Sequence, residues 1–212
     1  MLLDLLRKNR FFFAPYALLL AVVGILQSFY TQEQLMQWVN SRNSSIADIL
    51  FPYVTYMGDG IFFVVICILL SVYNWRIGLM ALASFVLSSL TSEFFKKIIF
   101  LGSPRPLKFF EHSTFNYHIV EGLDIYSYNS FPSGHTITAF AMFGLLAFLD
   151  NWKSRGWFWL SLSVLTGYSR VYLFQHFVED VFVGSLIGTL SSVIIFRLMS
   201  RWATKSHRLE NN

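Results

Sequence analysis

Residues 11–29, FFFAPYALLLAVVGILQSF, form an unbroken stretch without a charged side chain. An α-helix needs about 20 apolar residues to cross the hydrocarbon core of a bilayer, so this stretch predicts a membrane span. The basic residues Arg7, Lys8 and Arg10 precede it, as they would in a signal peptide. However, the apolar run is long and no Ala-x-Ala-like cleavage site follows it, so we interpret it as a membrane anchor.

The composition extends this interpretation to the whole chain. Of its 212 residues, 55% are hydrophobic and 13% are charged, with a mean hydropathy of +0.52. Soluble domains are about one quarter charged, so a single membrane domain over residues 1–212 is predicted. We expect an all-α, polytopic bundle of about six transmembrane helices, at residues 11–29, 54–73, 77–99, 134–149, 157–173 and 181–199.

The charge pattern argues against a nucleic-acid partner and indicates an orientation. The formal net charge is +4, but the basic residues lie at the ends of apolar segments and form no stripe with aromatic side chains. With both termini in the cytoplasm, ten of the sixteen Lys and Arg residues lie inside, as the positive-inside rule requires. Cys67 is the single cysteine, so no disulfide framework is possible. No protein partner can be predicted.

Two long segments, 30–53 and 100–133, are then expected as loops outside the cytoplasm, and the sequence assigns no role to residues 30–53 or 107–131. The second loop contains His112 and His118, whose spacing does not match that of a metal site.

The residue types best suited to catalysis and anion binding occur in the sequence Ser169-Arg170-x5-His176-x3-Asp180. His176 and Asp180 are four residues apart, so on a helix they would share a face and the carboxylate could reach the imidazole. A carboxylate that accepts from one ring nitrogen fixes the tautomer and makes the other nitrogen a better nucleophile or base. The guanidinium of Arg170 is suited to phosphate. Polar residues at a membrane edge are costly, which favours a functional role for them.

Two more polar clusters are predicted on the same membrane face. The first contains Lys96 and Lys97, followed by Arg105 between two prolines, and the second is Pro132-Ser133-Gly134-His135. Taken singly, each also fits a structural role: lysines that snorkel at the interface, a turn residue, and an ordinary helix start. Together with Arg170 and His176 they would supply cations, helix N-terminal N–H groups and a second histidine to one phosphoryl group.

These three clusters resemble the signature of the type-2 phosphatidic acid phosphatase family, which vanadium haloperoxidases share: Lys-x6-Arg-Pro, Pro-Ser-Gly-His and Ser-Arg-x5-His-x3-Asp. The second and third parts match in full, and the signature region covers about residues 93–184. The first part departs, because seven residues separate Lys97 from Arg105 and eight separate Lys96 from it. An additional residue in the turn at Gly102 would leave the lysine in place, so Lys97 is preferred and Lys96 is the alternative.

The resemblance implies a catalytic histidine that forms a phosphohistidine. His176 would be the nucleophile, Asp180 would be the carboxylate that orients it, and His135 would be the general acid. The implied phosphate-binding residues are Lys97, Arg105, Ser133, Gly134 and Arg170, with no metal and no cofactor. The expected reaction is hydrolysis of a lipid phosphate monoester or diphosphate at the outer face of a bacterial inner membrane. The family's substrates include phosphatidic acid, phosphatidylglycerol phosphate, undecaprenyl diphosphate and lipid A phosphates.

Alternative functions remain open from the sequence. A lipid phosphotransferase would use the same intermediate with another acceptor. An anion-binding membrane transporter belongs to a different class, but such sites tend to lie near the membrane midplane on broken helices in repeated halves, and no internal repeat is visible here. A haloperoxidase would need bound vanadate, and the proteins with that chemistry are typically soluble.

Overall fold

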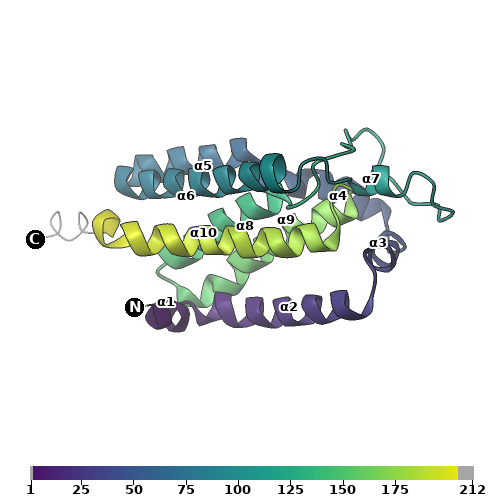
Figure 1. The fold of residues 1–212 in the computed structure, drawn as a ribbon. Coiled ribbons are helices and arrows are strands. Elements are labelled where there is room, and N and C mark those ends of the chain that lie inside the picture. Colours follow the sequence, from purple (N-terminus) through teal and green to yellow (C-terminus); the bar gives the residue numbers. More distant parts are fainter. Residues whose placement is uncertain (1, 205–212) are drawn as a thin grey trace, which may run out of the picture.

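The computed structural model describes residues 2–204, which form one helical bundle (Figure 1). Within these residues no strand is formed, and an isolated bridge joins Pro104 to Tyr128. The helices are α1 (Leu2–Lys8), α2 (Arg10–Phe29), α3 (Gln32–Asn40), α4 (Ser45–Val54), η1 (Thr55–Gly58), α5 (Gly60–Tyr73), α6 (Trp75–Phe94), η2 (Phe95–Ile99), α7 (Pro106–Phe109), α8 (Gly134–Leu149), η3 (Lys153–Arg155), α9 (Gly156–Tyr172) and α10 (Val178–Thr204).

An apolar helix lies in each of the six predicted regions, so the all-α class is confirmed. Among residues 2–204, three helices are long and apolar enough to cross a membrane: Arg10–Phe29, Trp75–Ile99 and Val178–Ala203. The number rises to four if the bent pair Ser45–Gly58 and Gly60–Tyr73 is one span. Helix α8 is apolar but shorter. Six crossings therefore stay a prediction.

The expected loop at 30–53 is mostly helical, which corrects the sequence interpretation. Thr31 caps α3 through a capping box with Gln34, and Ser44 caps α4 by accepting from the N–H of Ala47. Short amphipathic helices of this kind lack the long apolar run that identifies a span, so the sequence pattern did not separate them from a loop. The segment 100–133 is irregular except for α7.

The predicted span 54–73 is broken near its start. Residues Thr55–Gly58 form a 3₁₀ turn, and Asp59 caps α5 by accepting from the N–H of Ile61 at 2.7 Å. The helices on the two sides of this break meet at 57°. As a result, η1 turns inward and packs against α8 and α9, instead of continuing as part of a straight span.

Helix α8 forms the centre of the bundle and packs against α6, α9 and α10. Twelve of its sixteen residues are buried. Its contact with α10 depends on small residues, because a Cβ at Gly188 would lie 2.3 Å from the carbonyl oxygen of Ile137. This close approach fixes the start of α8 beside the start of α10.

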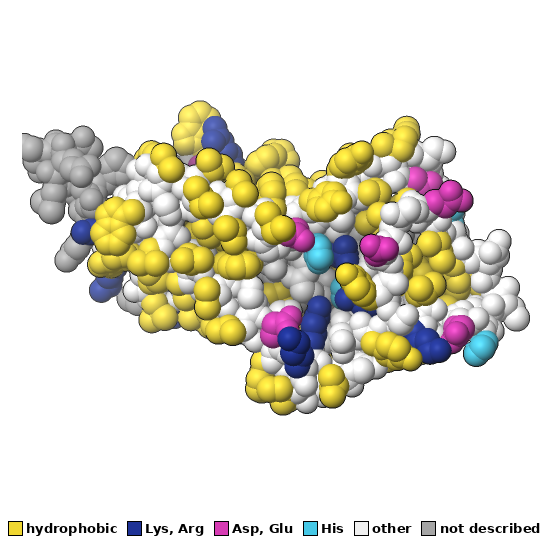
Figure 2. Space-filling view, turned by 90° about the horizontal axis from the view of Figure 1, so that it is seen from above, with side chains coloured by type: hydrophobic (Ala, Val, Ile, Leu, Met, Phe, Trp, Pro, Cys, Tyr) yellow, Lys and Arg dark blue, Asp and Glu magenta, His cyan; other side chains and the backbone are white. Residues whose placement is uncertain are grey.

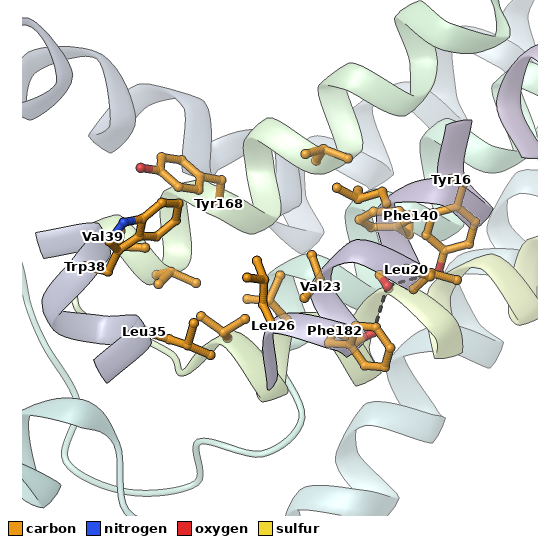
Figure 3. A pocket seen from close by; sticks show the side chains of 16 residues that line it. Tyr16, Leu20, Val23, Leu26, Leu35, Trp38, Val39, Phe140, Tyr168 and Phe182 are labelled. Atoms are coloured by element: carbon orange, nitrogen blue, oxygen red, sulfur yellow. Dashed lines mark hydrogen bonds between the residues drawn. The ribbon is translucent and has the colours of Figure 1, made fainter. Parts of the chain in front are cut away.

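Helix α2 lies at the edge of the bundle and encloses an apolar cavity of about 200 Å³ with α3, α8, α9 and α10 (Figure 3). The hydroxyl of Tyr16 is 3.0 Å from Oγ of Ser185, which ties α2 to α10 beside this cavity. Val171 and Val181 line it, next in sequence to Arg170 and Asp180. None of the residues that line it is a predicted site residue, so the chemistry must lie elsewhere.

Candidate active site

His176 and Asp180 form a buried pair at the junction of α9 and α10. Nδ1 of His176 lies 3.1 Å from Oδ2 of Asp180, and each side chain is 1% exposed. The pairing was predicted, but His176 precedes α10 instead of lying on it. Oδ2 of Asp180 also accepts from the backbone N–H of Phe177 at 2.9 Å and from the hydroxyl of Ser130. The carboxylate is therefore fixed by three groups, and it orients the imidazole so that Nε2 remains for chemistry.

A tight turn after α9 presents His176. The backbone N–H groups of Gln175 and His176 both donate to the carbonyl oxygen of Arg170, at 2.9 and 3.2 Å. Phe174 has a φ of +59°, an unfavourable backbone conformation for a large side chain. Its ring is buried against Tyr117 and Phe110, and this packing holds the turn. Unusual backbone conformations maintained by surrounding packing are frequent at functional sites.

Arg170 is buried and held from η1. Its Nη1 donates to Oγ1 of Thr55 at 2.7 Å, and it interacts electrostatically with Asp59. Its Nε is buried and has no hydrogen-bond partner within residues 2–204. A buried guanidinium N–H without a partner is costly, so this donor is suited to an anionic ligand.

Arg105 reaches the same place from the 100–133 segment. Its Nε donates to the carbonyl oxygen of Tyr128 at 3.0 Å, and its Nη1 donates to both the carbonyl oxygen and Oε1 of Gln175 at 3.1 Å. Gln175 in turn donates to the carbonyl oxygen of Asp124. The buried arginine is thus held by residues on both sides of the candidate site, and its side chain points into it instead of lying at the surface of a turn.

The start of α8 supplies His135, Ser133 and Gly134. A Cβ at Gly58 of η1 would lie 2.6 Å from the carbonyl oxygen of His135, so only glycine allows η1 to pack against the first turn of α8. Ser133 is fully buried, and its backbone N–H donates to the carbonyl oxygen of Asp180 at 3.1 Å. Gly134 lies within reach of Lys96, since a Cβ there would be 3.2 Å from Nζ of Lys96.

The structure places Lys96 toward the site, whereas the sequence analysis preferred Lys97. Lys97 is exposed, and its Nζ pairs with Oε2 of Glu93 at 2.7 Å. Lys96 is partly buried and interacts electrostatically with Arg105, Arg170 and Asp180. The physical reason is the π-helical turn Phe95–Ile99, which takes in more residues per turn than an α-helix and changes the direction of each side chain. The irregularity lies in the helix, and Lys96 is the lysine placed at the site.

The site is a strongly cationic hollow around one buried imidazole. His176 interacts electrostatically with Arg105, Arg170, Lys96 and His135. Burial lowers the pKa of His176 well below its ordinary value of 6.5, and these positive neighbours lower it further. Figure 2 shows charged and histidine side chains gathered in a hollow on an otherwise apolar face of the molecule. An anion is the ligand that such a site favours.

The histidines of the 100–133 segment do not join the site. Nε2 of His118 lies 3.0 Å from Oδ1 of Asp48, which also accepts from the hydroxyl of Tyr172 at 2.6 Å. Asn40 exchanges two hydrogen bonds with the backbone of His118, so this contact fastens the segment to α3 and α4. In the part of the chain that is described, no group of three or more His, Cys, Asp or Glu residues is placed to hold a metal ion.

Sequence reasoning missed four residues that shape the site: Ser130, Gln175, Thr55 and Gly58. Ser130 and Gln175 lie close to motif residues in the sequence, but only the structure shows that both are buried. Thr55 and Gly58 contact residues more than 70 positions away, as the hydrogen bond between Thr55 and Arg170 shows. A single sequence contains no information about such distant contacts.

Comparisons with known proteins agree with this arrangement. The model of the PAP2 superfamily matches residues 77–203, more than half of the chain. The chain belongs to the PAP2 superfamily. The resemblance seen in the three motifs is confirmed, and apolar helices together with transmembrane relatives indicate an integral membrane protein.

Individual relatives extend the comparison. Over 68 residues the chain is 46% identical to the bacitracin transport permease protein BcrC of Bacillus licheniformis, a match that covers 32% of each chain. Crystal structures of LpxE from Aquifex aeolicus and of a transmembrane PAP2-type phosphatidylglycerolphosphate phosphatase from Bacillus subtilis share the fold. Both have a TM-score of 0.66, at 24% and 23% identity. They cover 77% and 92% of this chain, which in turn covers 93% and 96% of theirs.

Proposed function

We propose that this PAP2 superfamily member is a membrane lipid phosphatase that hydrolyses a phosphate monoester or diphosphate through a phosphohistidine at His176. The observation that carries the proposal is the buried, Asp180-oriented imidazole surrounded by Arg105, Arg170 and Lys96. Cations clustered without an equal number of acidic groups repel one another, and a phosphoryl group relieves this repulsion. A neutral imidazole in this place is ready to attack phosphorus.

Each residue then has a definite role in two steps. In the first, Nε2 of His176 forms a bond to phosphorus while the bond to the leaving oxygen breaks, and His135 protonates that oxygen. In the second, His135 takes a proton from a water molecule whose oxygen bonds to phosphorus, while the bond from phosphorus to Nε2 breaks and inorganic phosphate leaves. Arg170 Nε, Arg105, Lys96 and the N–H groups at Gly134 stabilise the charge on the phosphoryl oxygens, which removes the need for a metal ion.

The activity is tested by phosphate release from purified protein in detergent, with phosphatidic acid, phosphatidylglycerol phosphate, undecaprenyl diphosphate and lipid A phosphates as separate substrates. We expect release from at least one of them in the presence of EDTA. Vanadate should inhibit it, because its trigonal-bipyramidal form resembles the transferring phosphoryl group. Activity that EDTA abolishes and a divalent metal restores would contradict the metal-free mechanism.

A transporter remains the second candidate, because one relative is named a transport permease. The two functions differ in what His176 must do: a transporter binds its anion without breaking a bond. Reversible binding of the anion without phosphate release, unchanged in His176→Ala, would favour transport. Radiolabel from a phosphate-labelled lipid that is trapped on the wild-type protein, and lost in His176→Ala, would favour the phosphatase.

The proposed outer location of the site is tested by cysteine labelling in intact cells. Cys67→Ser first removes the native thiol, which is buried. A cysteine placed at Ser113 should react with an impermeant reagent from outside, and one at Ser154 should react only after permeabilisation. The reverse pattern would place the active site in the cytoplasm.

A further inference from the structure

A second cationic hollow is lined in part by residues of α1, α8, η3 and α10. Figure 1 shows α1 and the C-terminal end of α10 at the opposite end of the bundle from the start of α10, which His176 precedes. The volume of the hollow is about 580 Å³. Four basic side chains and one acidic side chain, Asp4, line it. The basic residues are Lys8, Lys153, Arg197 and Arg201. The proposed chemistry at His176 uses none of them.

A buried amide oxygen in this hollow lacks a partner. Asn9 is 3% exposed and lines the cavity, and its Nδ2 donates to the carbonyl oxygen of Leu5 at 3.0 Å. Its Oδ1 is buried and accepts no hydrogen bond from residues 2–204. An amide oxygen can only accept, so the missing partner must be a donor. A hydroxyl group of a bound ligand can supply this donor without adding to the positive charge of the hollow.

Part of the wall of the hollow is apolar, and its surroundings are those of a membrane surface. Leu5, Phe148 and Phe196 line it beside the charges. Exposed tryptophans occur at the same end of the bundle, among them Trp152, at 66% exposed, and Trp202. Tryptophan is enriched at the level of lipid headgroups, so this hollow lies where a headgroup would lie.

We propose that this hollow binds the headgroup of an anionic phospholipid that carries a free hydroxyl, such as a phosphodiester of glycerol. The phosphate lies among Lys8, Lys153 and Arg197, and the hydroxyl donates to Oδ1 of Asn9. One acyl chain continues along Phe148 and Phe196. Basic pockets between helices at a membrane surface are a recurring way to bind anionic headgroups. The ligand is a phosphodiester, which distinguishes it from the monoester or diphosphate proposed at His176.

The charge contribution is tested with the full chain in neutral detergent, by native mass spectrometry with phosphatidylglycerol. The double variant Lys8→Gln/Arg197→Gln should weaken binding roughly 30-fold, the effect of two charges near a membrane surface. The matched control is Arg7→Gln/Arg10→Gln, which removes the same charge from neighbouring exposed positions outside the cavity. Equal weakening by both pairs would overturn the site, because it would show a general effect of charge.

The hydroxyl contact is tested by a matched pair of lipids. Phosphatidylmethanol has the same charge as phosphatidylglycerol but no headgroup hydroxyl, so the wild-type protein should bind it more weakly, and Asn9→Leu should remove the difference. Equal binding of the two lipids by the wild-type protein would overturn the role of Asn9, whether or not the variant folds. Glycerophosphoglycerol, the same phosphodiester without acyl chains, should bind far more weakly; binding as tight as that of the lipid would identify a soluble anion as the ligand. Repeating the measurement in His176→Ala separates this result from the phosphatase proposal.

Discussion

The two ends of the bundle both gather cations, but they hold them differently. Beside His176, Arg105 and Arg170 are each 7% exposed and are fixed by Tyr128, Gln175 and Thr55. At the other end, Lys8 and Arg197 are exposed around an open hollow. Fixed, buried donors stabilise a transition state because no reorganisation is needed when charge develops. Exposed, adjustable cations are sufficient for equilibrium binding of a headgroup.

This difference has an energetic consequence. A buried charge is costly unless it is paired and hydrogen-bonded, so removing one partner at the His176 end should affect several groups at once. Charges at the exposed end are screened by water and act more independently. The following changes test the buried end, where coupling between residues is the central expectation.

The largest effect is expected from His176→Ala, which should abolish turnover because no other residue presents a nucleophile at the same position. Asp180→Asn should leave weak activity, reduced roughly 10³-fold or more, since it disturbs the tautomer but keeps the nitrogen. Both are measured as steady-state phosphate release by purified protein. Near-normal turnover in His176→Ala would refute the covalent mechanism.

The next effect separates the two lysines. Lys96→Ala should remove a charge-assisted contact to the phosphoryl group and reduce kcat/KM roughly 10²-fold. Lys97→Ala is the matched control, because its partner is the exposed Glu93, and it should change kcat/KM by only about two-fold. The opposite ranking would restore the sequence-based preference for Lys97 and would show that the π-helical turn does not direct Lys96 to the substrate.

A smaller effect is expected at Thr55, which touches Arg170 and not the reacting atoms. Thr55→Val removes the hydroxyl that accepts from Nη1 of Arg170, so kcat/KM should fall roughly 10-fold, as for the loss of one hydrogen bond to a charged group. Thr55→Ser keeps the hydroxyl and should retain activity. A merely structural role would lower the melting temperature and leave kcat unchanged, whereas a positioning role should lower kcat in folded protein.

The local motifs of the site could be predicted from the sequence, whereas the residues that hold the motif side chains in place could not. The pairing of His176 with Asp180 followed from their spacing, although the structure forms it through a turn and a helix start. The sequence favoured Lys97 over Lys96, because a π-helical turn has no simple signature in residue type. Thr55 and Gly58 come to the site only because the helix breaks at residues 55–59. Such breaks are decided by tertiary packing.

The six apolar regions were equally accessible to sequence reasoning, because hydropathy reports directly on burial in lipid. The helices α3 and α4 were not, since they are only 9 and 10 residues long and depend on contacts with the 100–133 segment. The hydrogen bonds between Asn40 and the backbone of His118 illustrate this dependence. Residues far apart in sequence form this contact together.

The smallest effect concerns the protonation of His176. Because burial and the neighbouring cations hold its pKa below 6.5, the imidazole should stay neutral at pH values where an exposed histidine is already charged. The folded state then binds fewer protons than the unfolded state, so the free energy of unfolding should decrease as the pH falls below about 6.5. Nitrogen-15 NMR of histidine-labelled protein in detergent measures this pKa directly, with His176→Gln to assign the resonance. Adding inorganic phosphate should raise the pKa, because a bound anion offsets the positive neighbours. A free-protein pKa at or above the ordinary value would show that Asp180 outweighs the cations, and the imidazole would then need to lose a proton before attack.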